Sequence, residues 1–231
     1  MKLLALDTSS VACSVALQID DKIIDQHEEQ PREHTRLLLP MIESLLRESE
    51  ASLGDLDAIV LGNGPGSFIG MRIAASVAQG LAYGASLQIV PVSSMAAVAA
   101  RALADHEADE VVVAQDAHMN EVYLGVYGPG PDGAVKDRLP ERLHGLSVIE
   151  ELDSETSGGR VAAGYGWQRY PELLVENRDR VTRVLDIVHP RARDLLGLGA
   201  AGLEAGHGIE PREVQPAYLR QKVAQKPPAS T

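Results

Sequence analysis

The sequence predicts an α/β fold of two lobes, with mixed sheets flanked by helices. Three short strand patterns with tight connections open the chain, at residues 2–6, 12–19 and 22–28, and they indicate an antiparallel meander. Helix and strand patterns then alternate, as expected for a mixed sheet with helices on its faces. A new strand pair begins near residue 110 and indicates a second lobe. We therefore expect one lobe at residues 1–108, a smaller lobe at 109–220, and a basic, flexible tail at 221–231.

Composition narrows the class of protein. The 231 residues carry a formal net charge of −12. A surface this acidic repels phosphate groups on average, which argues against a free-standing nucleic-acid binder. The single cysteine, Cys13, excludes an internal disulfide and a Cys-based zinc site, and in an alternating apolar strand we expect it to be buried. Asp7 interrupts the first apolar stretch, and no run reaches transmembrane length, so a soluble, cytoplasmic protein is predicted.

The first predicted turn carries Asp7, Thr8 and Ser9 directly after a strand. An aspartate in this position can hold Mg²⁺ through water, while the hydroxyl and amide groups face phosphate oxygens. The alternative is an ordinary polar turn in which Asp and Ser side chains bond to the turn's own backbone. The residue types alone leave both interpretations open.

An amphipathic helix pattern covers residues 34–50, with Leu38, Ile42 and Leu45 on its apolar side. Pro40 lies inside this pattern, so we expect a kink there or a helix that begins near Leu39. His34 can reach a ligand, but a histidine at a helix start more often caps the helix or faces solvent, and we favour that interpretation.

Residues 61–84, LGNGPGSFIGMRIAASVAQGLAYG, are the stretch around which we organise the rest. An apolar strand pattern at residues 56–61 leads into glycines at 62, 64, 66 and 70, and a helix pattern follows. Strand, glycine loop and helix start together can cradle an anion. The spacing does not match a Walker A loop, a dinucleotide fingerprint or a nucleophile elbow. A tight turn with no ligand is an equally good interpretation.

The helix that follows, residues 70–84, has a narrow polar stripe. Arg72, Ser76, Gln79 and Tyr83 share one side, and most other positions are apolar or small. Either this helix is buried on several sides by its own lobe, or its small residues pack against a partner. We favour the first interpretation. The small residues are Ala74, Ala75, Ala78 and Ala82.

The remaining elements follow in order. We expect a strand at 88–91, a helix at 95–106 capped by Ser93 or Ser94, strands at 111–114 and 121–127, a Pro/Gly loop at 128–133, a strand-to-glycine turn at 160–166, and a helix at 192–205.

Candidate catalytic groups are few. The seven histidines include no pair with metal-ligand spacing, so we predict no metal site. Asp116, His118 and Glu121 gather at a hairpin turn and could perform acid/base chemistry, but turns collect such residues anyway. We therefore expect no catalytic residue there.

Several motifs together resemble the TsaB (YeaZ) family of bacterial tRNA threonylcarbamoyladenosine biosynthesis proteins, which is related to TsaD and the glycoprotease family. GPGSFxGxR at residues 64–72 is the most specific of them. One departure is His118, where the family pattern has arginine, so the contact made by that arginine is in doubt here. The motifs, in chain order over most of the sequence, are MKLLALDTSS, EHTRLLLPMI, GNGPGSFIGMRIAASVAQGLA, PVSSMAAVA, QDAHMNEVY and PAYLR.

The resemblance implies an actin-like ATPase fold of the ribonuclease H-like class (ASKHA), with two lobes. It implies a non-catalytic scaffold or activator subunit that docks TsaD, with TsaE joining, for threonylcarbamoylation of the tRNA adenosine beside the anticodon. tRNA would then be reached through the complex, and two copies would pair in the absence of TsaD. The expected partner interface comprises Leu38, Ile42, Leu45, Met71, Ala74, Ala75 and Ala78.

Two other functions remain open. One is a stand-alone actin-like enzyme, either a kinase or a peptidase. The other is a nucleotide sensor that binds ATP or ADP with Mg²⁺ at the lobe junction without turning it over. The nucleotide-binding candidates are Asp7, Thr8, Ser9, Gly64 and Gly66.

Overall fold

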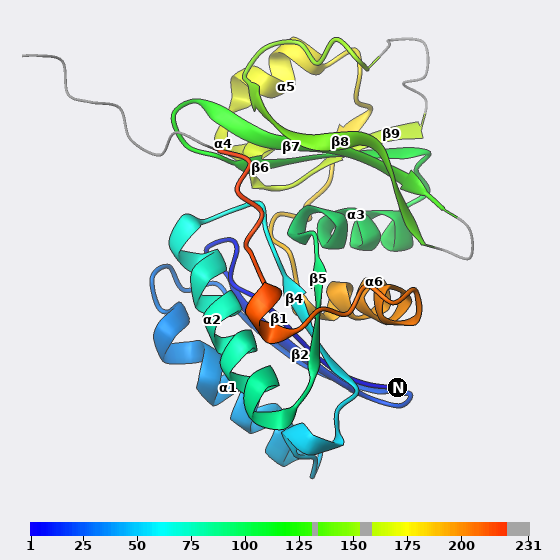
Figure 1. The fold of residues 1–231 in the computed structure, drawn as a ribbon. Helices are drawn as coiled ribbons and strands as arrows, with labels where there is room; N and C mark the ends of the chain where they lie inside the picture. Colours follow the sequence, from blue (N-terminus) through cyan, green and yellow to red (C-terminus); the bar gives the residue numbers. More distant parts are fainter. Residues whose placement is uncertain (131–133, 153–158, 221–231) are drawn as a thin grey trace, which may run out of the picture.

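The computed structural model describes residues 1–130, 134–152 and 159–220. Two five-stranded sheets lie one above the other, with α3 (Ser94–Asp105) and α6 (Ala192–Glu204) between them (Figure 1). This arrangement confirms the predicted mixed sheets with helices on their faces. The predicted flexible tail at 221–231 lies outside the described residues.

The first sheet has the strand order β3-β2-β1-β4-β5. The first three strands are antiparallel, which confirms the predicted meander, and β4 and β5 run parallel to β1. The carboxyl ends of β1 and β4 therefore meet at one edge, and the first turn comes to lie beside the glycine loop. The strands are β1 (Lys2–Asp7), β2 (Cys13–Ile19), β3 (Lys22–Glu28), β4 (Ala58–Gly62) and β5 (Gln88–Val92).

Alternate residues of β1 serve two cores. Leu4 and Leu6 pack in the cluster that includes α1 (His34–Glu48) and α2 (Phe68–Ala85), while Leu3 and Ala5 pack in the cluster that includes α6. Helix α1 begins at His34 and contains Pro40, so the alternative start near Leu39 is wrong. Its apolar side lies in the core as predicted. A short 3₁₀ turn, η1 (Leu53–Asp55), connects α1 to β4.

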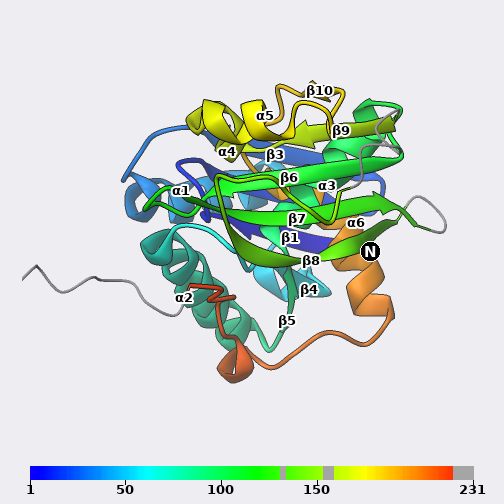
Figure 2. The ribbon, with the colours of Figure 1, turned by 90° about the horizontal axis from the view of Figure 1, so that it is seen from above.

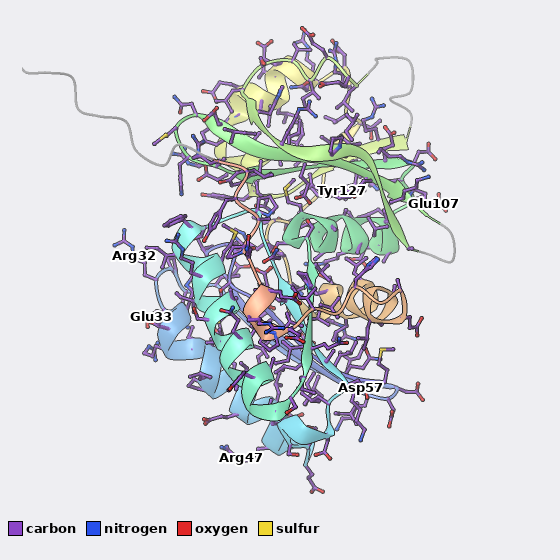
Figure 3. All side chains as sticks on the ribbon, in the orientation of Figure 1. Arg32, Glu33, Arg47, Asp57, Glu107 and Tyr127 are labelled. Carbon is purple, nitrogen blue, oxygen red and sulfur yellow. The ribbon has the colours of Figure 1, made fainter. Side chains whose placement is uncertain are left out.

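The second sheet has the order β10-β9-β6-β7-β8. Helix α3, whose N-cap Ser93 accepts hydrogen bonds from two backbone amides, packs on β6 and β7. Tyr127 lies between this sheet and α3 (Figure 3), fully buried, and its hydroxyl donates to Glu141 at 2.6 Å. The strands are β6 (Glu110–Asp116), β7 (Glu121–Pro129), β8 (Val135–Gly145), β9 (Arg160–Ala163) and β10 (Arg183–Val184), and the helices on the other face are α4 (Tyr165–Arg169) and α5 (Pro171–Asn177).

The chain crosses back to the first sheet after β10. Helix α6, which we expected in the second lobe, packs on β1, β2, β4 and β5. The segment after it pairs Ile209 with Ile89, passes through η4 (Pro211–Glu213) and runs along α2 (Figure 2). In the described part of the chain, no helix is both long and apolar enough to cross a membrane.

Close backbone contacts join α2 to the first turn. A Cβ atom at Gly66 would lie 2.1 Å from the carbonyl oxygen of Ser9, and one at Gly70 would lie 1.9 Å from that of Thr8. Both distances are far below a real carbon–oxygen contact. The glycines are therefore required where the loop and helix approach the turn.

We expect Gly70→Ala to lower the free energy of unfolding by about 2 kcal/mol or more, because the new methyl group forces α2 away from the turn. Gly80→Ala is the matched control, since a Cβ atom there meets nothing within 4 Å. That change should raise stability by about 0.5–1 kcal/mol. Urea unfolding followed by circular dichroism measures both, and equal stability of Gly70→Ala and the wild type would contradict the packing argument.

Candidate functional site

The carboxylate of Asp7 lies at the junction of the first turn, the glycine loop and α3. It is 1% exposed. Its Oδ1 accepts hydrogen bonds from the backbone amide and the hydroxyl of Ser9, both at 2.8 Å, and its Oδ2 accepts one from the Ser94 hydroxyl at 2.5 Å. Burial raises the pKa of Asp7, while these hydrogen bonds oppose the rise. Both carboxylate oxygens are thus partnered by protein groups, as the polar-turn interpretation expects.

The other predicted nucleotide-binding residues take part in the same junction. The Thr8 hydroxyl donates to the carbonyl of Gly70 at 2.7 Å, and the amide of Gly64 donates to the Ser94 hydroxyl at 3.0 Å. The amide of Ser67 donates to the Ser9 carbonyl at 2.6 Å. The surface that the glycine loop approaches is therefore the protein's own first turn.

A cavity of about 730 Å³ opens between the two sheets, beside this junction. Of the five predicted nucleotide-binding residues, Ser9 and Gly66 line it. The starts of α1 and α2 form one side, and the end of β6 and the start of α4 form the other. Its further lining includes Val11, Arg32, His34, Thr35, Ile69, Ile73, Gln115, Asp116, His118, Tyr165, His189 and Pro190.

Three histidines line this cavity, and they differ in burial and in the groups that they contact. His34 is 7% exposed and its Nε2 lies 2.8 Å from the Ser10 carbonyl, so the expectation of a capping or solvent-facing side chain is wrong. His189 is buried beside the ring of Tyr165, and burial lowers its pKa and favours the neutral imidazole. The side chain of His118 is 81% exposed and lies 3.2 Å from Asp116. The sequence offered no signal for His189, because it belongs to a connection between elements.

The hairpin between β6 and β7 does bring Asp116, His118 and Glu121 together, but two of them already have structural partners. Asp116 accepts a hydrogen bond from the Tyr170 hydroxyl at 2.8 Å, and Glu121 forms an ion pair with Arg220 at 2.7 Å. No group of three or more His, Cys, Asp or Glu side chains suited to a metal ion occurs within residues 1–130, 134–152 and 159–220.

The seven predicted interface residues are buried in the protein's own core, with exposed fractions of at most 5%. The intramolecular interpretation of the small face of α2 is therefore confirmed. These side chains offer no surface to a partner while the fold is intact. The same two helices expose other large apolar side chains instead, namely Leu39, Phe68, Ile69 and Tyr83.

Removing the Ser94 hydroxyl tests the junction. We expect Ser94→Ala to lower the free energy of unfolding by about 1–3 kcal/mol, because Asp7 Oδ2 and the Gly64 amide each lose a partner in a buried place. Exposed Ser76 on α2 is the control, and Ser76→Ala should change stability little.

The same variant also changes how the free energy of unfolding depends on pH. Because burial raises the pKa of Asp7 in the folded chain, stability falls as pH rises from the ordinary carboxyl pKa through the raised one. The Ser94 hydrogen bond lowers that pKa, so Ser94→Ala should extend the fall toward neutral pH. Urea unfolding at several pH values measures this, and a parallel profile for the two proteins would contradict it.

Comparisons with known proteins agree over nearly the whole chain. A family model described as TsaD, tRNA N6-adenosine threonylcarbamoyltransferase, matches residues 20–148. The tRNA threonylcarbamoyladenosine biosynthesis protein TsaB of Escherichia coli (strain K12) is 38% identical over 226 residues, which cover 98% of this chain and 97% of that protein. The protein of the same name from Haemophilus influenzae is 36% identical and covers 98% of this chain and 96% of its own.

Solved structures are similar to the same extent. A Pseudomonas aeruginosa crystal structure, described as an uncharacterized protein with similarity to peptidase YEAZ, has a TM-score of 0.87 and 38% identity and covers 95% of this chain and 99% of that one. YeaZ from Pseudomonas aeruginosa has a TM-score of 0.83 and 36% identity, covering 94% and 99%. The predicted actin-like α/β class and the resemblance are confirmed, and the chain belongs to the TsaB (YeaZ) family.

Proposed function

We propose that this chain is a non-catalytic scaffold or activator subunit in the biosynthesis of threonylcarbamoyladenosine in tRNA. It docks TsaD, and TsaE joins the complex that modifies the adenosine beside the anticodon. The names of the relatives support the pathway, since both are described as tRNA threonylcarbamoyladenosine biosynthesis proteins. tRNA is reached through the complex, because the net charge of −12 disfavours direct phosphate binding.

The observation that carries the docking proposal is an exposed apolar surface on α1 and α2. These helices lie side by side on the side of the first sheet opposite α6 (Figure 1). Leu39 is 45% exposed, Ile69 70% and Tyr83 83%, although each sits on a helix whose other side is core. Exposed large apolar side chains that are spread along two adjacent helices are typical of an interaction surface. We call Leu39, Phe68, Ile69, Arg72 and Tyr83 the α1–α2 face.

This face replaces the buried residues first expected at the interface. The core residues of the two helices hold the face rigid, and the exposed residues supply the contact area. A standard interface buries about 1,600 Å² in total, which two adjacent helices with their flanking loops can provide. In the absence of TsaD, the same face pairs two copies of the chain.

A nucleotide sensor is the second candidate, and the cavity between the sheets favours it. The cavity volume of about 730 Å³ falls in the range of small-molecule sites. ATP or ADP with Mg²⁺ would contact Ser9 and Gly66 there. Catalysis by a stand-alone kinase has less support. A kinase needs an aspartate as general base, and both carboxylate oxygens of Asp7, the nearest candidate, already accept hydrogen bonds from Ser9 and Ser94. Calorimetric titration with Mg–ATP, with turnover measured in parallel, separates a sensor from an enzyme.

Docking is tested by size-exclusion chromatography with light scattering, on this chain mixed with TsaD from the same organism. We expect a mixed complex with the wild type and its loss with Ile69→Glu or Leu39→Glu, because each places a charge in an apolar contact. Val175→Glu is the control, since Val175 is 61% exposed on α5, at the other end of the molecule (Figure 1).

Two outcomes contradict the proposal. The wild type and TsaD eluting separately under all conditions would remove the subunit role. A complex that survives both Ile69→Glu and Leu39→Glu would place the interface elsewhere on the chain.

A further inference from the structure

Arg72 is the only charged residue of α2, and it lies on the exposed side of the helix. The exposed positions of α2 otherwise carry apolar, small or uncharged residues. The chain as a whole has a net charge of −12, but α2 carries one positively charged side chain and no acidic one. Such a surface favours an electrically complementary, acidic group on whatever covers it.

Aromatic rings fix the position of the Arg72 guanidinium. Its central carbon lies 3.5 Å from the centroid of the Phe68 ring and 5.5 Å from that of Tyr218. Its Nε–H donates a hydrogen bond to the Tyr218 hydroxyl at 2.9 Å. Stacking and hydrogen bonding together reduce the rotamer freedom that an arginine loses on binding.

Tyr218 is itself held in place by residues distant in sequence. It belongs to the C-terminal strap, residues 215–220. The amide of Ala217 donates to the Asn63 carbonyl at 3.1 Å, and the Asn63 side chain donates to the Gln215 carbonyl at 3.0 Å. Beyond it, Arg220 pairs with Glu121 of the second sheet at 2.7 Å. The strap therefore anchors Tyr218 against α2 from both ends.

The remaining N–H groups of Arg72 have no partner within the described ranges. No carboxylate there forms an ion pair with it, whereas Arg193 pairs with Asp25 at 3.0 Å and Arg212 with Glu210 at 2.8 Å. A guanidinium can bind a carboxylate through two parallel hydrogen bonds. Arginine and tyrosine side chains are also enriched among the residues that dominate binding energy at interfaces.

We propose that Arg72 binds an aspartate or glutamate side chain of the docked TsaD subunit, and that Phe68 and Tyr218 hold it ready to do so. This inference rests on the proposed function and names the polar anchor of the α1–α2 face. A protein carboxylate fits better than an RNA phosphate, because exposed Ile69 and Phe68 next to Arg72 require an apolar partner surface.

The test measures the dissociation constant of the full-length chain with TsaD by calorimetry. We expect Arg72→Gln to weaken binding about thirty-fold or more, as for removal of one partner from a desolvated charge pair. Arg72→Lys should recover only part of the affinity, since an ammonium group lacks the bidentate geometry. Arg178→Gln is the matched control, because Arg178 is a largely exposed arginine beside α5. This variant should bind TsaD with the affinity of the wild type.

Salt dependence distinguishes the ion pair from a structural effect. Affinity of the wild type should fall as salt is raised, and that of Arg72→Gln should fall less. Tyr218→Ala, which removes the ring but keeps the cation, should retain the salt dependence of the wild type. If Arg72→Gln and Tyr218→Ala weaken binding equally with equal salt dependence, Arg72 acts only by holding the strap and the proposal is overturned.

The remaining outcomes separate the two proposals. If the wild type binds TsaD and Arg72→Gln binds as tightly, the ion pair is wrong while the docking role stands. If the wild type does not bind TsaD, the docking role fails and this inference with it. If Arg72→Gln leaves TsaD binding unchanged but weakens binding to tRNA, the anchor is for a phosphate and the carboxylate proposal is overturned.

Discussion

The contact between the first turn and the glycine loop is the constraint on which the rest of this structure depends. Parallel pairing of β1 and β4 brings the turn and the loop to the same sheet edge. Carbonyl oxygens of Thr8 and Ser9 then occupy the space that side chains at Gly70 and Gly66 would need. This close approach sets the position of α2 and, through Ser94, that of α3. One junction therefore determines both the position of α2, which carries most of the α1–α2 face, and one wall of the cavity.

Local sequence patterns predicted the first sheet well, because short turns and apolar runs mark its strands. The turn at Asp20-Asp21 placed a strand at residues 22–28 with those same bounds, and the N-cap preference of serine identified the start of α3. The return of α6 to the first sheet was missed, since a helix pattern does not say which sheet it will cover. Strand β8 was missed as well. Its 11 residues, VKDRLPERLHG, lie at a sheet edge, are mostly polar and include a proline, so they lack the apolar alternation of a strand.

The glycine loop was correctly predicted to approach another surface, but the sequence did not show whether that surface was a ligand. Its spacing predicted a close approach of backbone to another surface, and that approach exists. Sequence could not say whether the surface belonged to a ligand or to the chain, because residues 7–10 and 62–70 come together only through sheet pairing. The same limit applied to the helix faces. Small and apolar residues such as Ala75 and Leu38 suit a core and an interface equally, and burial assigns them to the core.

The cavity and the α1–α2 face are not independent surfaces, because Ile69 belongs to both. The strap joins them a second time, since Arg220 donates to the carbonyl of Ala117 beside the cavity-lining hairpin and Tyr218 contacts Arg72 on α2. A ligand that shifts Ile69 or the hairpin therefore also changes the α1–α2 face. Binding free energies are reciprocal, so if a ligand in the cavity changes the affinity of this face for a partner, the partner changes the affinity of the cavity by the same factor. If both proposals hold, nucleotide sensing and subunit docking would be coupled through Ile69 and the strap, rather than being competing uses of the fold.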